Sequence, residues 1–258
     1  MKEQLYTIPL NDAVNAMDEC PFCYIERNVE QDLLDFVLGS GSSYMEADIR
    51  EMTDKAGFCR SHFKKMFDYG NTLGNAWILK THYQKMIQEM QEEFAPLMKG
   101  KGLSGKPSFR NKFLKATSSD SPVSTWVQKK EESCYVCKGF KDTYARYLDT
   151  FFYMYKKDED FKQRIESSRG FCLPHFRDLC EGAEVKLNDK EKEEFYSTML
   201  PLMIENMKRV AEDVSWMVEK FDYRNKDADW KDSKDSLQRG MQKLKGGYPA
   251  DSVYSMKK

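Results

Sequence analysis

Hydrophobic residues recur at helical spacing along most of the chain. The run YIERNVEQDLLDFVL (24–38) places its apolar side chains on one face and acidic residues opposite, and the GSGS that follows predicts the end of this helix. A second helix is predicted in 42–57, between serines suited to an N-cap and Gly57, a residue that tolerates the left-handed conformation at a helix end. Alternation of period two is nowhere sustained, so we expect an all-α protein.

Long helices are predicted in both halves of the chain. One amphipathic run covers 71–98, and the second half has helical patterns in 144–155, 161–170 and 191–221, where Pro201 predicts a kink or a boundary. Four aromatic residues of the second half share one helical face and are expected to pack in the core: Tyr144, Tyr147, Phe151 and Tyr155.

Two short phrases occur twice in the same order. CPFC (20–23) and GFCRSHF (57–63) in the first half correspond to CYVC (134–137) and GFCLPHF (170–176) in the second half. A long helical stretch follows each phrase. We therefore expect two tandem, pseudo-symmetric helical repeats.

This repeat sets the expected domain organisation. We expect a first helical repeat with a metal site in 1–99, a second in 131–222, and a tail with a short helix in 223–258. The intervening 100–130 is rich in Gly, Ser, Pro and Lys, which predicts a basic linker.

Composition narrows the classes of partner. The 41 basic and 42 acidic residues nearly cancel, so no overall field attracts nucleic acid or an anionic membrane. Proteins that bind single-stranded nucleic acid stack the bases on aromatic side chains, and the basic part of the linker has only Phe109 and Phe113 for this purpose. We therefore expect a solvated linker rather than a flexible arm that binds nucleic acid. The sequence has no apolar stretch of about 18 residues and no signal-peptide pattern, so we expect a cytoplasmic protein without a membrane partner.

Cysteine and histidine carry the candidate chemistry. Six of the seven cysteines and two of the three histidines lie in the repeated motifs, and Cys3His is a standard ligand set for structural zinc. We expect two zinc ions, one in each half, held by Cys20, Cys23, Cys59 and His62 and by Cys134, Cys137, Cys172 and His175. The alternative, in which each site takes ligands from both halves, stays open.

The spacing of these residues suits a metal site at helix ends. Two ligands three residues apart share one face of a helix, and a helix start favours thiolate. Each ion is therefore expected to join two helix N-termini. A redox dithiol would use CxxC alone and leaves Cys59 and His62 without a role. An iron–sulfur cluster with Cys3His ligation is a further alternative, whereas cysteines that only fill a core would not need to recur in this order.

Closed sites favour a binding function. Four protein ligands leave no open position for water, which makes the metal structural. We expect a zinc-stabilised binding or adaptor protein whose partner is a protein or a small molecule. The alternatives are a metal-dependent or thiol-redox enzyme and an iron–sulfur electron carrier. Long amphipathic helices pack equally well within or between chains, so the oligomeric state stays open.

The motifs together resemble a bacterial family of unknown function. Its members combine a CPxC near the N-terminus, a GFCxxH, a second CxxC, a second GFCxxH with the phrase LPHF, and a tail resembling FDYR followed by Trp. Here the motifs are CPFC, GFCRSH, CYVC, GFCLPHF and KFDYR with Trp230, so the resemblance covers nearly the whole chain. It implies duplication and metal ligation but no particular reaction. CYVC lacks the proline of CPFC, although ligation does not depend on it.

Overall fold

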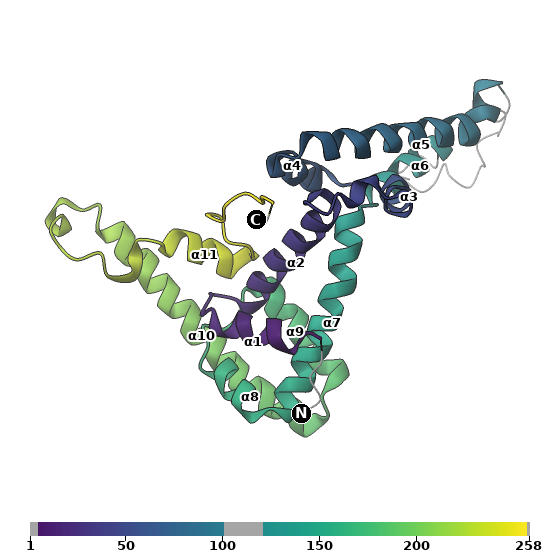
Figure 1. Cartoon of the computed structure of the whole chain (residues 1–258). Helices are drawn as coiled ribbons and strands as arrows, with labels where there is room; N and C mark the ends of the chain where they lie inside the picture. Colours follow the sequence, from purple (N-terminus) through teal and green to yellow (C-terminus); the bar gives the residue numbers. More distant parts are fainter. Residues whose placement is uncertain (1–4, 101–120, 257–258) are drawn as a thin grey trace, which may run out of the picture. The chain divides into compact units, whose positions relative to one another are not determined.

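The computed structural model describes residues 5–100 and 121–256. Regular structure in these ranges is entirely helical, which confirms the all-α prediction (Figure 1). The α-helices are α1 (Thr7–Asn15), α2 (Pro21–Leu38), α3 (Ala47–Ala56), α4 (Arg60–Tyr69), α5 (Thr72–Met98), α6 (Pro122–Glu131), α7 (Tyr135–Lys157), α8 (Glu159–Glu166), α9 (Leu173–Lys186), α10 (Asp189–Glu219) and α11 (Ser236–Lys245), and the 3₁₀ turns are η1 (Ser43–Met45), η3 (Tyr223–Asn225) and η4 (Lys231–Ser233). Among the described helices, none has both the length and the apolar composition that crossing a bilayer requires.

Several helix ends lie where the sequence predicts them. Gly57 follows α3 with a φ of +62°, and the side chain of Asn71 caps α5 by accepting a hydrogen bond from the Gly74 backbone N–H at 2.8 Å. Pro201 does not end a helix, because α10 continues through it. Met199 and Leu202 on either side of Pro201 are buried, and their packing compensates for the hydrogen bond that proline cannot donate.

Part of the expected linker is also helical. Residues 101–120 lie outside the described residues, but α6 begins at Pro122 after Ser121 in an extended N-cap conformation. The ring of Trp126 in α6 lies edge-on to Phe94 of α5, with centroids 5.4 Å apart. This contact gives the polar helix an apolar anchor.

The chain divides into two compact units. Unit 1 comprises Met1–Glu30 and Phe140–Ser252, and unit 2 comprises Gln31–Gly139 and Val253–Lys258. The division falls inside α2 and α7, so each unit contains residues from both halves of the sequence. The equivalence of the two sequence repeats remains a prediction.

Aromatic side chains dominate the core of unit 1. The fully buried residues with the largest side chains are Phe22, Phe151, Phe161, Phe171 and Phe195. Of the aromatic stripe on α7, Tyr147, Phe151 and Tyr155 are buried, as expected for core residues. Burying one large apolar side chain stabilises a fold by about 1.5–3 kcal/mol, so this cluster is a major contribution to stability. Helix α11 packs against α9 and α10 at the edge of this core.

Unit 2 has a core of mixed aliphatic and aromatic residues and a structural histidine. Leu34, Leu38, Met66 and Ile78 are almost completely buried there. The third histidine of the chain, His82, places Nδ1 2.9 Å from the carbonyl oxygen of Asp54 and packs its ring against the open side of Gly57. His82 therefore holds α5 against the end of α3, as a satisfied structural residue would.

Candidate metal centres

All eight candidate ligands occupy equivalent positions at helix N-termini. Cys59 and Cys172 are the N-cap residues of α4 and α9. The carbonyl oxygens of Cys20 and Cys134 accept the first intrahelical hydrogen bonds of α2 and α7, from Tyr24 and Lys138. The second ligand of each pair is the third residue of its helix: Cys23, His62, Cys137 and His175. Side chains at these two positions face each other, as in a capping box, and the partial positive charge of the helix end stabilises thiolate.

A left-handed glycine precedes each GFC cysteine. Gly57 and Gly170 have φ values of +62° and +72°, which strain any residue with a Cβ. The carbonyl oxygen of Gly57 also accepts a hydrogen bond at 2.9 Å from the backbone N–H of Tyr135, beside CYVC. The glycine turn therefore directs the cysteine into its helix and connects the two ligand-bearing segments of unit 2.

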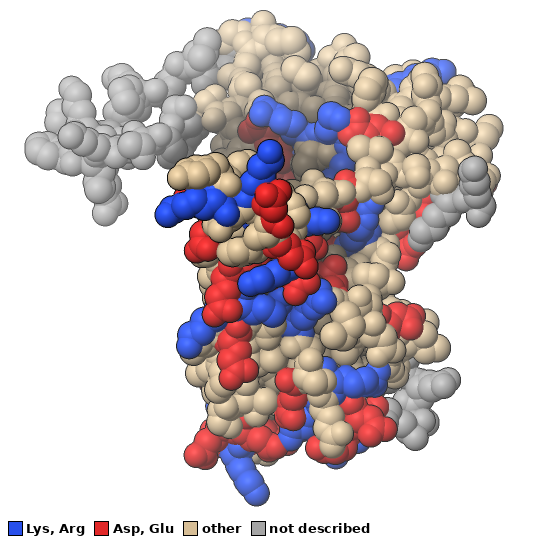
Figure 2. Space-filling view, turned by 90° about the vertical axis from the view of Figure 1, so that its left-hand side faces the viewer, with Lys and Arg blue, Asp and Glu red and all other residues tan. Residues whose placement is uncertain are grey.

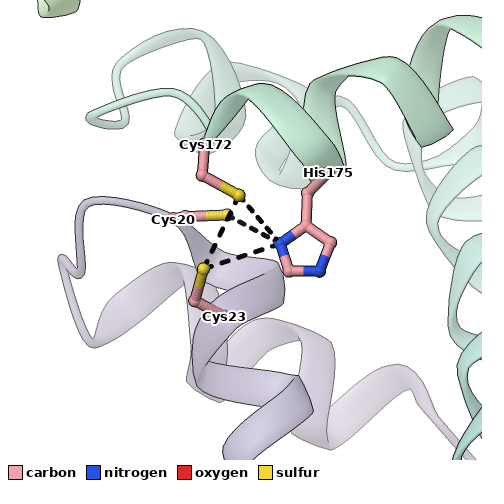
Figure 3. A group of neighbouring side chains, drawn as sticks. All are labelled: Cys20, Cys23, Cys172 and His175. Atoms are coloured by element: carbon pink, nitrogen blue, oxygen red, sulfur yellow. Dashed lines mark hydrogen bonds between the residues drawn. The ribbon is translucent and has the colours of Figure 1, made fainter. Parts of the chain in front are cut away.

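Site 1 lies in unit 1 and consists of Cys20, Cys23, Cys172 and His175, all of them buried. In Figure 3 the three sulfur atoms surround one nitrogen of the imidazole, two of them from the N-terminus of α2 and one from α9. Nδ1 of His175 lies 3.4 Å from Sγ of Cys20, 3.6 Å from Sγ of Cys23 and 3.1 Å from Sγ of Cys172. The sulfur atoms of Cys23 and Cys172 are 3.7 Å apart.

Site 2 lies in unit 2 and consists of Cys59, His62, Cys134 and Cys137. Nδ1 of His62 lies 3.2 Å from Sγ of Cys59 and 3.3 Å from each of the other two sulfur atoms. The sulfur atoms of Cys59 and Cys137 are 3.8 Å apart. Cys137 is exposed and Cys59 partly exposed, whereas all four residues of site 1 are buried.

Each site takes its ligands from both halves of the sequence, so the expected grouping within each half is corrected. The CxxC of one half meets the CxxH of the other, which is the alternative that the sequence left open. The division into units gives the reason. Helices α2 and α7 each continue from one unit into the other, so Cys20 and Cys23 share unit 1 with the second CxxH, and Cys59 and His62 share unit 2 with the second CxxC.

The distances in both sites suit one tetrahedral zinc ion. With Zn–S of about 2.3 Å and Zn–N of about 2.0 Å, ligands at tetrahedral corners lie roughly 3.8 Å apart for two sulfurs and roughly 3.5 Å apart for sulfur and nitrogen. The observed S–S distances of 3.7 and 3.8 Å match, and the S–N distances of 3.1 to 3.6 Å come close. A disulfide needs about 2.05 Å, and all seven cysteines are free.

Burial in site 1 keeps the thiols protonated when no cation is present. Burial raises the pKa of Cys20 far above its usual range. The hydrogen bond with Cys20 lowers the pKa of Cys172, but the hydrogen bond with Cys23 and burial raise it more, to about 12. Burial lowers the pKa of His175 to about 4, so the imidazole is neutral at pH 7. A metal ion would therefore bind with release of protons.

In site 2, one thiol has a pKa below its usual value. Burial raises the pKa of Cys134, but hydrogen bonds with His62 and with the backbone outweigh it and lower the pKa to about 6. The pKa of Cys137 rises to about 12 because of burial and the neighbouring Cys134. One thiolate is thus available at neutral pH before an ion arrives, which favours capture of a cation.

Neighbouring side chains fix the imidazole of His175. The rings of Phe22 and Tyr144 lie against it, with centroid distances of 5.8 and 5.6 Å. Oε2 of Glu26 lies 3.8 Å from Nε2, the ring nitrogen that faces away from the sulfur atoms in Figure 3. A carboxylate on that side favours the tautomer in which Nε2 carries the proton and Nδ1 faces the ion.

A buried charge network supports site 1 from outside the motifs. The carboxylate of Glu19, next to Cys20, lies 2.6 Å from Arg209, 3.2 Å from Lys243 and 3.5 Å from Arg239. Lys243 also donates to the backbone carbonyls of Glu19 and Arg169, the residues that precede CPFC and the second GFC. One side chain of α11 therefore connects both ligand-bearing turns of site 1.

Two glycines of the tail cover the sulfur atoms of site 1. A Cβ at Gly246 would lie 3.5 Å from Sγ of Cys172 and 3.8 Å from Sγ of Cys23. The backbone of Gly247 hydrogen-bonds to Cys23, and both glycines have positive φ. These glycines and the Glu19 network are not predictable from the sequence, because no local pattern links the tail to the CPFC motif more than 200 positions away. The GG pair after the predicted short helix was the one available signal.

Comparison with known proteins identifies the family of the chain. A family model with the description "Family of unknown function (DUF6062)" matches residues 1–251, so the chain belongs to this family. No curated protein and no solved structure matches it.

Proposed function

We propose that this DUF6062 protein is a zinc-stabilised helical binding protein that holds one zinc ion in each of sites 1 and 2. One observation carries the proposal: two separate Cys3His sets, each with the edge lengths of a zinc tetrahedron. The eight residues of the repeated motifs are the ligands in this proposal. Zinc would supply charge neutralisation for the thiolates and a cross-link between two helix starts.

Each ion would close a long loop of the chain. Site 1 joins Cys23 of α2 to Cys172 of α9, which are 149 residues apart. Site 2 joins Cys59 at the start of α4 to Cys137 of α7, which are 78 residues apart. Links of this length remove many conformations from the unfolded chain, which is the physical basis of a stabilising role.

The ligand number favours a structural role over catalysis. Each site offers three sulfurs and one nitrogen from the protein, which completes a tetrahedron and leaves no position for water or substrate. A thiol-redox enzyme or an iron–sulfur electron carrier would use the same residues differently, and the metal analysis below separates these alternatives.

The charge distribution supports a partner other than nucleic acid. On the face shown in Figure 2, Lys and Arg are interspersed with Asp and Glu, with no extended area of one sign. Unit 1 also has a polar pocket of about 280 Å³, which is a candidate place for a small polar partner. It is lined by Asp18, Cys23, Tyr24, Arg27, Asn28, Gln242, Tyr248 and Asp251.

Metal analysis tests the proposal. Protein purified without air is expected to contain two zinc ions per chain by elemental analysis and to be colourless in the visible range. Complete chelation should lower the free energy of unfolding, because both loops open. Iron with sulfide, or a metal-free protein with a titratable dithiol, would contradict the zinc assignment. An unchanged unfolding curve after verified removal of both ions would contradict the structural role.

A further inference from the structure

We infer that site 2 is an oxidant-sensitive zinc site, at which a peroxide converts Cys59 and Cys137 to a disulfide and releases the ion, while site 1 keeps its zinc. The inference rests on the proposed function, since it concerns the fate of zinc at the two sites. It assigns a site of reversible oxidation to site 2 alone, although the two sites have the same kinds of ligand. Oxidation would then regulate zinc binding at site 2.

Exposure of the cysteine residues separates the two sites. In site 1, Cys20 and Cys172 are 0% exposed and Cys23 is 6% exposed. Gly246 and Gly247 of the tail cover this site. In site 2, Cys137 is exposed and Cys59 partly exposed. Oxidation of cysteine follows thiolate character and access, so a small oxidant in solution meets site 2 first.

The two accessible sulfurs of site 2 are also direct neighbours. Sγ of Cys59 and Sγ of Cys137 lie 3.8 Å apart, at the ends of short side chains on the starts of α4 and α7. A disulfide requires about 2.05 Å, so closing the bond needs a movement of about 2 Å by the sulfur atoms. The hydroxyl oxygen of Ser61 lies 3.1 Å from Sγ of Cys59, where it can donate a hydrogen bond to that sulfur.

The chemistry is balanced with a peroxide as the oxidant. In the zinc-loaded protein, where Cys137 is held as a thiolate, its sulfur attacks one oxygen of hydrogen peroxide, which breaks the O–O bond, forms a sulfenic acid and releases hydroxide. The thiolate of Cys59 then attacks the sulfenic sulfur, forms the S–S bond and expels the second oxygen as hydroxide. Two protons convert both hydroxides to water. The sulfurs lose two electrons in total, and peroxide gains them.

Loss of two thiolates leaves Cys134 and His62 as the remaining ligands of site 2. Two ligands hold zinc far more weakly than four, so the ion leaves and the link between α4 and α7 becomes a disulfide. A dithiol reductant reverses the bond and restores the ligands. Peroxide could also oxidise Cys23, which is the one residue of site 1 that borders a pocket. Only 6% of Cys23 is exposed, so we expect this reaction to be slow.

The test begins with protein of measured metal content. If the chain does not hold two zinc ions, the proposed function fails before any oxidant is added. With two ions bound, hydrogen peroxide is added and zinc release is followed with a chromogenic chelator. One ion is expected to leave at least roughly tenfold faster than the other. Peptide mass spectrometry should find a disulfide between Cys59 and Cys137 and no disulfide among Cys20, Cys23 and Cys172.

Matched variants assign the fast and the slow phase of zinc release to the two sites. Cys23→Ser should remove the slow phase and leave the fast one, and Cys137→Ser should remove the fast phase. If either variant fails to fold, the mass spectrum of the wild-type protein still decides. Equal rates for both ions, a first disulfide within site 1, or no release at peroxide excess would each overturn the inference while leaving the zinc content intact.

Discussion

Pairs of serine substitutions distinguish the ligand sets in the structure from sets confined to each half of the sequence. Cys20→Ser and Cys172→Ser should each remove the same zinc ion, so the double variant retains one ion per chain. Cys20→Ser with Cys59→Ser should remove both ions, because these residues belong to different sites. Ligation within each half would give the reverse result for both pairs.

The loop lengths set the size of the effect on stability. Closing a loop of 149 residues at site 1 stabilises the fold by about 5 kcal/mol in the chain-entropy treatment, and a loop of 78 residues at site 2 by about 4.5 kcal/mol. A second substitution in the same site should add little to the first. Substitutions in different sites should add nearly fully and approach the whole stability of a typical domain, which is about 5–15 kcal/mol.

Elemental analysis and urea denaturation give the two readouts. Zinc content per chain is measured first, and the free energy of unfolding is then compared for single and double variants in the same buffer. Each single serine variant serves as the control for its pair. If the Cys20 and Cys172 double variant loses both ions, or if its two stability losses add fully, the assignment of these residues to one site is wrong.

Further substitutions test the residues outside the repeated motifs that contact site 1. Glu19→Gln leaves buried cations without their carboxylate, so we expect a loss of about 3–5 kcal/mol in urea denaturation, against at most about 1 kcal/mol for the exposed Glu181→Gln. Burial raises the pKa of Glu19, but Arg209 and Lys243 outweigh it and lower the pKa below its usual 4.5. The ionised Glu19 therefore stabilises the fold above pH 4.5, and this stabilisation is lost as the pH falls through the lower pKa of the folded state. If the free energy of unfolding falls by the same amount on acidification in the wild-type protein and in Glu19→Gln, this assignment is wrong. Gly246→Val should weaken zinc binding at site 1 in competition with a chelator, because its methyl groups press on two ligand sulfurs. Gly100→Val meets the same kind of backbone strain in open space, outside both candidate sites, and is the matched control, so equal effects would exclude the contact as the cause.

Local sequence patterns predicted the parts that depend on neighbours along the chain. Apolar spacing, a glycine after α3 and an asparagine before α5 specify helix positions through contacts within a few residues. Composition predicted a linker where α6 lies. A serine at the N-cap position and a proline in the first turn mark the start of this helix within a polar stretch. Packing of Trp126 on Phe94 stabilises this helix, and that contact is not visible in composition.

The candidate site shows the same division between local and tertiary information. The sequence by itself determined the eight candidate ligand residues and their place at helix starts, because a spacing of three residues is a property of one helical turn. Only the tertiary structure decided which pairs meet, since that depends on which compact unit each end of α2 and α7 joins. It alone also brought Glu19, Lys243 and the tail glycines to site 1 and left site 2 open, because burial is set by residues distant in sequence.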